Sequence, residues 1–286
     1  MSVSQGLAGL RVAIFESRLS EEFANLLRKQ GAQPSVAPSI VEVPLSLGPE
    51  LREGVDHLRA GRLTVWCVLT GVGQRKLVEL LKPLLSAEEL AELLGHVLVA
   101  ARGPKSVAAL REIGVRPGVV APAPHTWREL FEAISSQQPL DGALVALQQY
   151  GAPHERLTRA FTDAGASVLQ LPVYRWQLPT DRGPLAQMVE RIVAGEIDVI
   201  LFTSGPQVDA LLQVARELGV ESSLRAALSR IALGSIGPSC SETLRACDLS
   251  PDFEPEHGKM GQLVRKAAEV ASSVLVRKRG VDDSGC

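Results

Sequence analysis

The chain has 286 residues and a formal net charge of −2, with 30 lysines and arginines against 32 aspartates and glutamates. It therefore has no general attraction for nucleic acid, and with 6 Phe, 3 Trp and 2 Tyr it has few rings on which bases could stack. Hydrophobic residues at 45% and charged residues at 22% exclude disorder and collagen-like repeats. The length favours two domains or one large domain.

Short apolar segments alternate with longer amphipathic ones along the chain. Predicted strands lie at 11–15, 34–38, 64–70, 97–101, 118–122, 143–150, 167–176, 198–204 and 230–236. Predicted helices lie at 19–32, 72–81, 86–95, 105–114, 126–137, 154–165, 184–196, 206–219, 239–248 and from about Met260 onward. Because the strands are continuous apolar runs, we expect both sheet faces to be covered by helices, which indicates an α/β protein with parallel sheets.

Two extended, proline-bearing segments at 39–49 and 171–179 interrupt this alternation. If they pair, they form a two-stranded linker that leaves 50–170 as an inserted domain, while 1–38 and 180–280 close a discontinuous one. The predicted fold is therefore two flavodoxin-like or Rossmann-like parallel-sheet domains, the second inserted in the first.

No export signal, membrane span or metal motif is recognisable. The N-terminal segment has a five-residue apolar run without a basic flank, and no apolar stretch approaches the roughly 20 residues of a membrane span. The four cysteines show no CxxC spacing, and the histidines stand apart from them. We expect a cytoplasmic protein with reduced thiols, no metal and a loose polar tail at 281–286, in which Cys286 is a bystander.

Five predicted strand-to-helix junctions are rich in small residues: 69–73, 101–106, 148–153, 202–207 and 235–240. Ligands of parallel sheets bind where strands end, because the following helices expose unpaired N–H groups and the positive end of their dipole. Candidate substrate-binding residues in these junctions are Thr70, Gly71, Gly73, Lys105, Ser106, Gln149, Thr203, Ser204, Gly205, Gly237 and Ser239. Five such turns facing one cleft favour a large ligand with many negative groups.

Each of these candidates also has a plain structural interpretation. Ser106, Ser204 and Ser239 stand where N-cap residues stand, and Lys105 could be a solvated surface lysine instead of an ammonium that binds a carboxylate. The motifs GxGxxG, GxxxxGK[ST], GxSxG and HExxH are absent. The sequence thus offers binding surfaces without a recognisable reactive centre.

An ordered series of segments resembles the uroporphyrinogen-III synthases from Leu10 to about residue 272. The segments are VLTGVGQRKLVELL at 68–81, VLVAARGPKSVAALREIGVRP at 97–117, YRWQLP at 174–179, EIDVILFTSGPQVDALL at 196–212 and IALGSIGPSCSETLRACDLSPDF at 231–253. The resemblance implies two α/β domains on a two-stranded linker. It also implies a cofactor-free reaction in which hydroxymethylbilane loses water, inverts its last pyrrole ring through a spiro intermediate and closes to uroporphyrinogen III. The eight carboxylates of this substrate suit a site built from helix N-termini.

The resemblance also implies roles for single residues. Tyr174 matches the family's tyrosine on the strand that leaves the inserted domain, where it would hydrogen-bond the departing hydroxyl or position the last ring. As a plain alternative, Tyr174 covers apolar surface in the linker. Ser106 and Ser204 match hydroxyl residues of the family, whereas its common hydroxyl pair in the second Gly-Pro turn is Ser239 and Cys240 here.

The implied partner is hydroxymethylbilane, with transfer from hydroxymethylbilane synthase suggested, and we expect a monomer that contacts neither nucleic acid nor membrane. One alternative is a catalytically silent, tetrapyrrole-binding regulatory relative of the same fold. Such domains are sometimes fused to a DNA-binding module, and after the last predicted helix we expect no such module. Another is a two-lobed solute-binding protein, which would need export.

Overall fold

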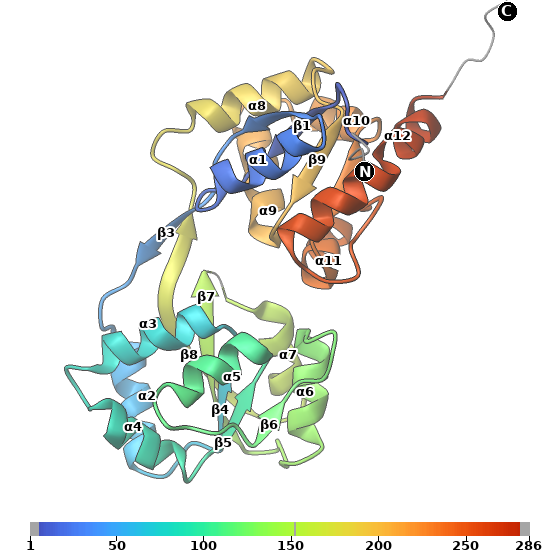
Figure 1. Ribbon diagram of the computed structural model, residues 1–286. Helices are drawn as coiled ribbons and strands as arrows, with labels where there is room; N and C mark the ends of the chain where they lie inside the picture. The colour runs from blue at the N-terminus through green and yellow to red at the C-terminus, as the bar shows by residue number, and fades with distance from the viewer. Residues whose placement is uncertain (1–5, 152, 281–286) are drawn as a thin grey trace, which may run out of the picture. The chain divides into compact units, whose positions relative to one another are not determined.

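The computed structural model describes residues 6–151 and 153–280, which divide into two compact units (Figure 1). Unit 1 takes in the described parts of Met1–Val41 and Gln177–Cys286, and unit 2 is Glu42–Trp176. The expected α/β class with two parallel sheets is confirmed. The tail at 281–286, predicted to be loose, lies outside the described residues.

Unit 1 is built on a four-stranded parallel sheet in the order β10-β9-β1-β2. Its strands are β1 (Arg11–Ile14), β2 (Gln33–Val36), β9 (Val199–Phe202) and β10 (Ala232–Ser235). Its helices are α1 (Ser20–Lys29), α8 (Gly183–Val193), α9 (Gly205–Glu217), α10 (Glu221–Leu228), α11 (Pro238–Ala246) and α12 (Met260–Arg279). The register sets Val199 opposite both Val12 and Ala232, so the three strands end at one edge.

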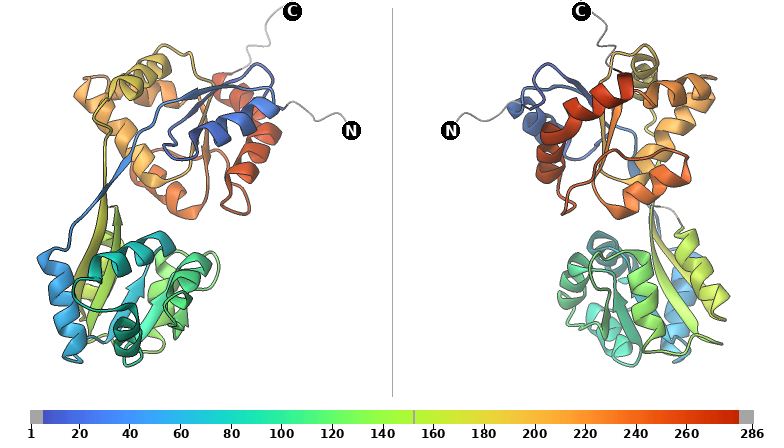
Figure 2. Two further views of the ribbon diagram at one scale, coloured as in Figure 1. Left: turned by 60° about the vertical axis from the view of Figure 1, so that its left-hand side comes forward. Right: turned by 90° about the vertical axis from the view of Figure 1, so that its right-hand side faces the viewer.

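Helices cover both faces of this sheet, as the continuous apolar strands predict. Alternate residues such as Phe15 and Phe202 pack against α8, α9, α10 and α11. The residues between them, such as Ile14 and Leu201, pack against α1 and α12, which lie on the same side of the sheet in Figure 2. Both layers together exclude water from the strands.

An ion cluster fixes the amino-terminal edge of the sheet. Asp198, which is 5% exposed, accepts hydrogen bonds from the backbone N–H, Nε and Nη2 of Arg11 and from Nη2 of Arg279, each 2.9 Å long. Burial alone would raise the pKa of Asp198, but the hydrogen bonds from Arg11 and then Arg279 outweigh it and hold the pKa well below its usual value. The cluster ties β1, β9 and the end of α12 together.

Unit 2 has a six-stranded sheet in the order β3-β8-β7-β4-β5-β6. Its strands are β3 (Val41–Pro44), β4 (Val65–Val68), β5 (Leu98–Ala101), β6 (Val119–Val120), β7 (Leu144–Gly151) and β8 (Ser167–Gln177). Its helices are α2 (Pro49–Arg59), α3 (Gly71–Leu81), α4 (Ala87–Leu94), α5 (Pro104–Arg111), α6 (Trp127–Ser135) and α7 (Glu155–Asp163). Helices α2, α3, α4 and α5 cover one face, and α6 and α7 cover the other.

Helix α2 is an element that the sequence pattern left unassigned. Leu51, Val55 and Leu58 are buried at helical spacing, and Pro49 occupies the first turn, where its missing N–H costs nothing. The predicted extended segment 39–49 ended at Pro49, and no helix was predicted after it.

The described residues include no helix with the length and apolar character needed to cross a bilayer.

The segment 39–49, predicted to form one half of a linker, contains β3, and the segment 171–179 contains the second part of β8, which begins at Ser167. The two strands are neighbours in the sheet and can be followed side by side in Figure 1. The N–H of Leu45 donates to the carbonyl oxygen of Val173 at 3.4 Å. Both strands belong to the six-stranded sheet, so the pairing continues directly from the core of unit 2.

Candidate functional site

Each unit carries two helix N-termini side by side at the carboxyl edge of its sheet. In unit 2, α3 and α5 follow the neighbouring strands β4 and β5; in unit 1, α9 and α11 follow the neighbouring strands β9 and β10. Glycines allow the close approach. A Cβ on Gly71 would lie 2.2 Å from the carbonyl oxygen of Lys105, and a Cβ on Gly205 would lie 2.2 Å from Oγ1 of Thr243. These two glycines are therefore required for packing.

Helices α5, α9 and α11 begin with a Gly-Pro pair and have N-cap residues Gly103, Ser204 and Gly237. Among the described residues, no side chain accepts a capping hydrogen bond at these three N-termini. Proline has no N–H, and the N–H of the third residue of each of the three helices already donates to the carbonyl oxygen of the N-cap residue. The first-turn N–H groups of Lys105, Gly205 and Ser239 therefore remain for a ligand, at a place where the helix dipole favours an anion. Helix α3 differs, because the Thr70 hydroxyl accepts the N–H of Gly73 at 3.1 Å.

The structure separates the three candidate serines. Ser204 is the N-cap of α9, as the sequence suggests. The expected N-cap positions of Ser106 and Ser239 are wrong, because α5 and α11 begin earlier, at Pro104 and Pro238, and the two serines lie in their first turns. Ser239 is exposed, whereas the buried Ser106 is 2% exposed.

Gly237 is the one candidate glycine with open space beside it. A Cβ on Gly73 would lie 1.6 Å from Nε2 of Gln148, so this glycine, like Gly71 and Gly205, is held by packing. Gly237 has an extended backbone with φ 171°, and nothing described lies within 4 Å of an added Cβ. Apart from its chain neighbours, no protein atom therefore blocks the main chain on this side, although Gly237 itself is buried.

Thr203 is already engaged in intramolecular hydrogen bonds. Its hydroxyl donates to Oε2 of Glu16 at 2.6 Å and accepts from Nε2 of Gln207 at 2.8 Å. Its N–H donates to Oε1 of the same glutamine at 2.8 Å. Thr203 therefore shapes the turn, and Gln207, which the sequence pattern did not indicate, is its main partner.

A cationic and aromatic cluster lies at the carboxyl edge of unit 2. Nη1 of Arg102, which directly follows β5, donates to the hydroxyl of Tyr150 at 3.2 Å, and the guanidinium lies 5.4 Å from the centroid of that ring. The Tyr150 ring packs edge-on against Trp176 at 5.3 Å. Gly151 has φ 77°, and a Cβ on it would lie 2.0 Å from Trp176. The sequence pattern indicated Lys105, which is exposed, and missed Arg102, although Arg102 lies in the same junction.

Tyr174 belongs to this aromatic neighbourhood and to the core of unit 2. It lies on β8, is 3% exposed, and its ring centroid is 6.4 Å from that of Trp176. The apolar packing proposed as its plain alternative role is present. Its catalytic role stays a prediction.

The junction at 148–153 is not a tight strand-to-helix turn. Strand β7 continues to Gly151, with Gln149 half-buried opposite Pro172, and α7 begins only at Glu155. His154 caps that helix by accepting the N–H of Leu157 at 3.3 Å, and an acidic residue occupies the first turn. The His154 cap and the acidic first turn make the start of α7 less suited to an anion than the starts of α5, α9 and α11. A role of Gln149 in substrate binding stays a prediction, and Ala152 lies outside the described residues.

The buried cysteines are not poised as nucleophiles. Burial raises the pKa of the Cys67 thiol to about 12, although Arg102 opposes the shift. Burial likewise raises the pKa of Cys240 to about 11. Cys240 is 3% exposed, so the position where the family often has a second hydroxyl points into the core of unit 1.

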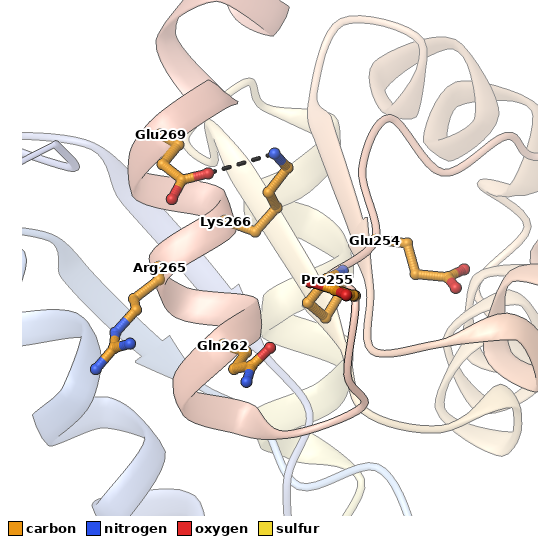
Figure 3. Close-up of a pocket in the computed structure, with 7 residues that line it drawn as sticks. Glu254, Pro255, Gln262, Arg265, Lys266 and Glu269 are labelled. Carbon is orange, nitrogen blue, oxygen red and sulfur yellow. Dashed lines mark hydrogen bonds and ion pairs between the residues drawn. The ribbon is translucent and has the colours of Figure 1, made fainter. Parts of the chain in front are cut away.

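A cavity of about 570 Å³ lies in unit 1 between α12 and the segment that precedes it (Figure 3). It is lined by Glu254, Pro255, Glu256, Gln262, Arg265, Lys266 and Glu269. Lys266 and Glu269 form an ion pair with Nζ and Oε2 3.3 Å apart, as Figure 3 shows. None of the sequence candidates lines this cavity, and carboxylates of the protein would repel an acidic ligand there.

Comparisons with known proteins agree with this architecture. A family model for uroporphyrinogen-III synthase HemD matches residues 21–265. The fold is similar to the crystal structure of a mutant uroporphyrinogen III synthase from Thermus thermophilus, with a TM-score of 0.73, 28% identity, and coverage of 93% of this chain and 99% of that one. The wild-type protein of that organism is 30% identical with a TM-score of 0.59, covering 93% and 98%. The uncharacterized protein YjjA of Bacillus subtilis strain 168 is 27% identical over 272 residues, covering 93% of this chain and 98% of its own.

Proposed function

The chain belongs to the uroporphyrinogen-III synthase family, and from that premise we propose that it converts hydroxymethylbilane into uroporphyrinogen III. The observation that carries the proposal is the repeated pair of helix N-termini at the carboxyl edge of each sheet. A linear tetrapyrrole with eight carboxylates needs many anion contacts. Helix N-termini supply them without requiring a buried cation for each one.

We assign the carboxylate contacts unit by unit. In unit 1, the N-termini of α9 and α11 would bind through backbone N–H groups, with Gly237 leaving room for a close approach. In unit 2, the start of α5 would act together with Arg102 and the flexible ammonium of Lys105, and the turn between β4 and α3 would bind through the N–H groups that the Thr70 cap does not take. Arginine offers a fork of donors that suits a carboxylate, and its hydrogen bond to Tyr150 limits its rotation.

The chemistry requires loss of one water with no net oxidation. When the terminal hydroxyl leaves as water, the resulting azafulvene is reactive by itself, and uncatalysed closure gives the uninverted isomer I. The protein must therefore hold the two chain ends so that the inverted closure is faster, which is catalysis by proximity and orientation. Tyr174 would hydrogen-bond the departing hydroxyl or position the last ring, while fixed N–H donors stabilise developing negative charge.

A coupled assay tests the proposal. Freshly made hydroxymethylbilane is supplied to the full chain, the products are oxidised, and isomers I and III are resolved by chromatography. Isomer III above the spontaneous background supports the enzyme. Isomer I alone overturns it and leaves the silent tetrapyrrole-binding relative.

Tyr174→Phe then tests the one side chain given a chemical role. Loss of the phenol oxygen should lower turnover at least about tenfold, because even a single positioned hydrogen-bonding group contributes that much to a proton-assisted step. The ring, and with it the apolar packing, is retained, so losing the buried hydroxyl and its contacts should cost about 1 kcal/mol and lower the thermal transition by no more than about 5 °C. Unchanged kinetics would exclude the phenol from the reaction.

A further inference from the structure

The turn between β9 and α9 in unit 1 is held by a buried carboxamide. Oε1 of Gln207 accepts the N–H of Thr203 at 2.8 Å, and the glutamine is 3% exposed. Thr203 lies one residue beyond the end of β9, where the ladder of sheet hydrogen bonds stops. The carboxamide thus fixes a backbone group that the sheet leaves unpaired.

The turn between β4 and α3 in unit 2 is held in the same way, from a different side. Oε1 of Gln148, which is fully buried on β7, accepts the N–H of Leu69 at 2.9 Å and the N–H of Thr70 at 3.0 Å. Nε2 of Gln148 has no partner among the described residues and lies where a Cβ on Gly73 would be, in the first turn of α3. An unpaired buried donor is costly, so its retention needs a reason.

The strand registers show that the two arrangements are equivalent. Val65 of β4 lies opposite Val145 and Leu98, just as Val199 of β9 lies opposite Val12 and Ala232. Counting on from these strands, Leu69 corresponds to Thr203, so the same backbone N–H is bound in both units.

By the same count, Gly73 corresponds to Gln207, and Gln148 corresponds to Phe15. The carboxamide therefore comes from the helix in unit 1 and from the neighbouring strand in unit 2. In unit 2, where β7 supplies the carboxamide, the matching helix residue is Gly73, which leaves room for it. In unit 1, where α9 supplies the carboxamide, the matching residue after β1 is Phe15, which stacks on Phe202.

We infer that Gln148 and Gln207 are positioning residues that hold these two turns in the conformation that binds a carboxylate of the substrate. The substrate part of this inference rests on the proposed function. A hydrogen bond to an N–H at the strand end restricts where the next peptide groups point, and an anion contact through backbone N–H groups loses strength steeply when their direction changes. Both glutamines are buried, so they act through the turns and not on the substrate.

Moving the carboxamide within unit 2 tests the inference. Gln148→Ala removes it and should raise the exchange rate of the Leu69 and Thr70 amides at least about tenfold, and raise KM for hydroxymethylbilane about tenfold with kcat within about twofold. The double variant Gly73→Gln with Gln148→Ala copies the unit 1 arrangement. It should restore slow exchange of the Leu69 amide and bring KM back to within about threefold of wild type.

Two further variants keep the result interpretable. Gln207→Ala should speed exchange of the Thr203 amide alone, which gives a reading in unit 1 if the double variant in unit 2 does not fold. Gln170→Ala is the matched control. This half-buried glutamine lies on β8, the neighbour of β7 that is farther from β4, and its Nε2 donates to Oγ1 of Thr158 at 2.8 Å, away from both turns. It should leave KM and exchange in both turns unchanged.

The inference is overturned if the turn amides of Leu69, Thr70 and Thr203 exchange at the wild-type rate in Gln148→Ala and Gln207→Ala. It is also overturned if the double variant folds but its Leu69 amide exchanges as fast as in Gln148→Ala. If the wild-type chain makes no isomer III, the proposed function and the substrate part fall together. Amide exchange still decides in that case whether the carboxamides hold the turns.

Discussion

Replacing two glycines of the candidate site by alanine separates packing from ligand approach. In Gly71→Ala the new methyl would lie 2.2 Å from the backbone oxygen of Lys105, more than 1 Å inside ordinary contact, and a backbone atom of a neighbouring helix cannot turn aside. Overpacking of this kind costs about 1–3 kcal/mol. For a unit of this size, that loss lowers the midpoint of thermal unfolding by about 4–10 °C.

Gly237→Ala places its methyl in open space, with nothing described within 4 Å and an extended backbone that alanine adopts. The fold should therefore be as stable as wild type or up to about 1 kcal/mol more stable, because alanine restricts the unfolded chain. If a substrate oxygen approaches this backbone, the same methyl should raise KM for hydroxymethylbilane about tenfold or more.

The assay for both variants is differential scanning calorimetry together with the isomer-resolved turnover assay. The expected result is a destabilised Gly71→Ala and a stable Gly237→Ala with weakened substrate binding. A loss of stability in Gly237→Ala as large as in Gly71→Ala would refute the packing argument. A wild-type KM in Gly237→Ala would remove that turn from the site.

Two other perturbations test the ion cluster around Asp198 in unit 1 and the burial of Cys67 in unit 2. Asp198→Ala removes the acceptor of four hydrogen bonds from Arg11 and Arg279. Because both arginines are about one-third exposed, they regain water when the carboxylate is lost. We therefore expect the free energy of unfolding at pH 7 to fall by about 3 kcal/mol, the low end for a broken buried ion pair. Because the folded pKa of Asp198 lies below its unfolded value of about 3.9, this stabilisation is full well above pH 4 and is lost progressively as pH falls towards the folded pKa. The urea unfolding curves of variant and wild type should therefore approach each other as pH is lowered below about 4; a constant difference would contradict the assignment. Cys67 is fully buried and burial raises its pKa to about 12, so iodoacetamide at pH 8 should label it only after unfolding. Labelling of Cys67 in the native chain, located by peptide mass spectrometry, would show that unit 2 opens.

Much of the fold follows from local patterns in the sequence. Runs such as Val65–Val68 and Val199–Phe202 are apolar at every position, and such runs can only be stable where helices cover both faces of a sheet. Helix α2 was not predicted, because Gly48 and Pro49 are typical of a loop. The same two residue types also occur at the start of helices.

The candidate site followed from sequence only in outline. Gly-Pro pairs after apolar strands marked the starts of α5, α9 and α11, because proline is tolerated in the first turn and glycine before it. The junction at 148–153 was placed within one residue of the observed end of β7 and start of α7, but the sequence pattern did not show that His154 caps α7.

The sequence by itself determined the parallel α/β class, the places where strands give way to helices, and the family, because these depend on short-range apolar periodicity and on residues close together in the chain. Only the tertiary structure decided beside which small residues there is space for a ligand, and beside which that space is occupied by other parts of the protein. Gly73 and Gln148 are 75 positions apart, yet one vacates the space that the other occupies. Such complementarity arises when separate strands and helices pack in three dimensions, and no local pattern encodes it.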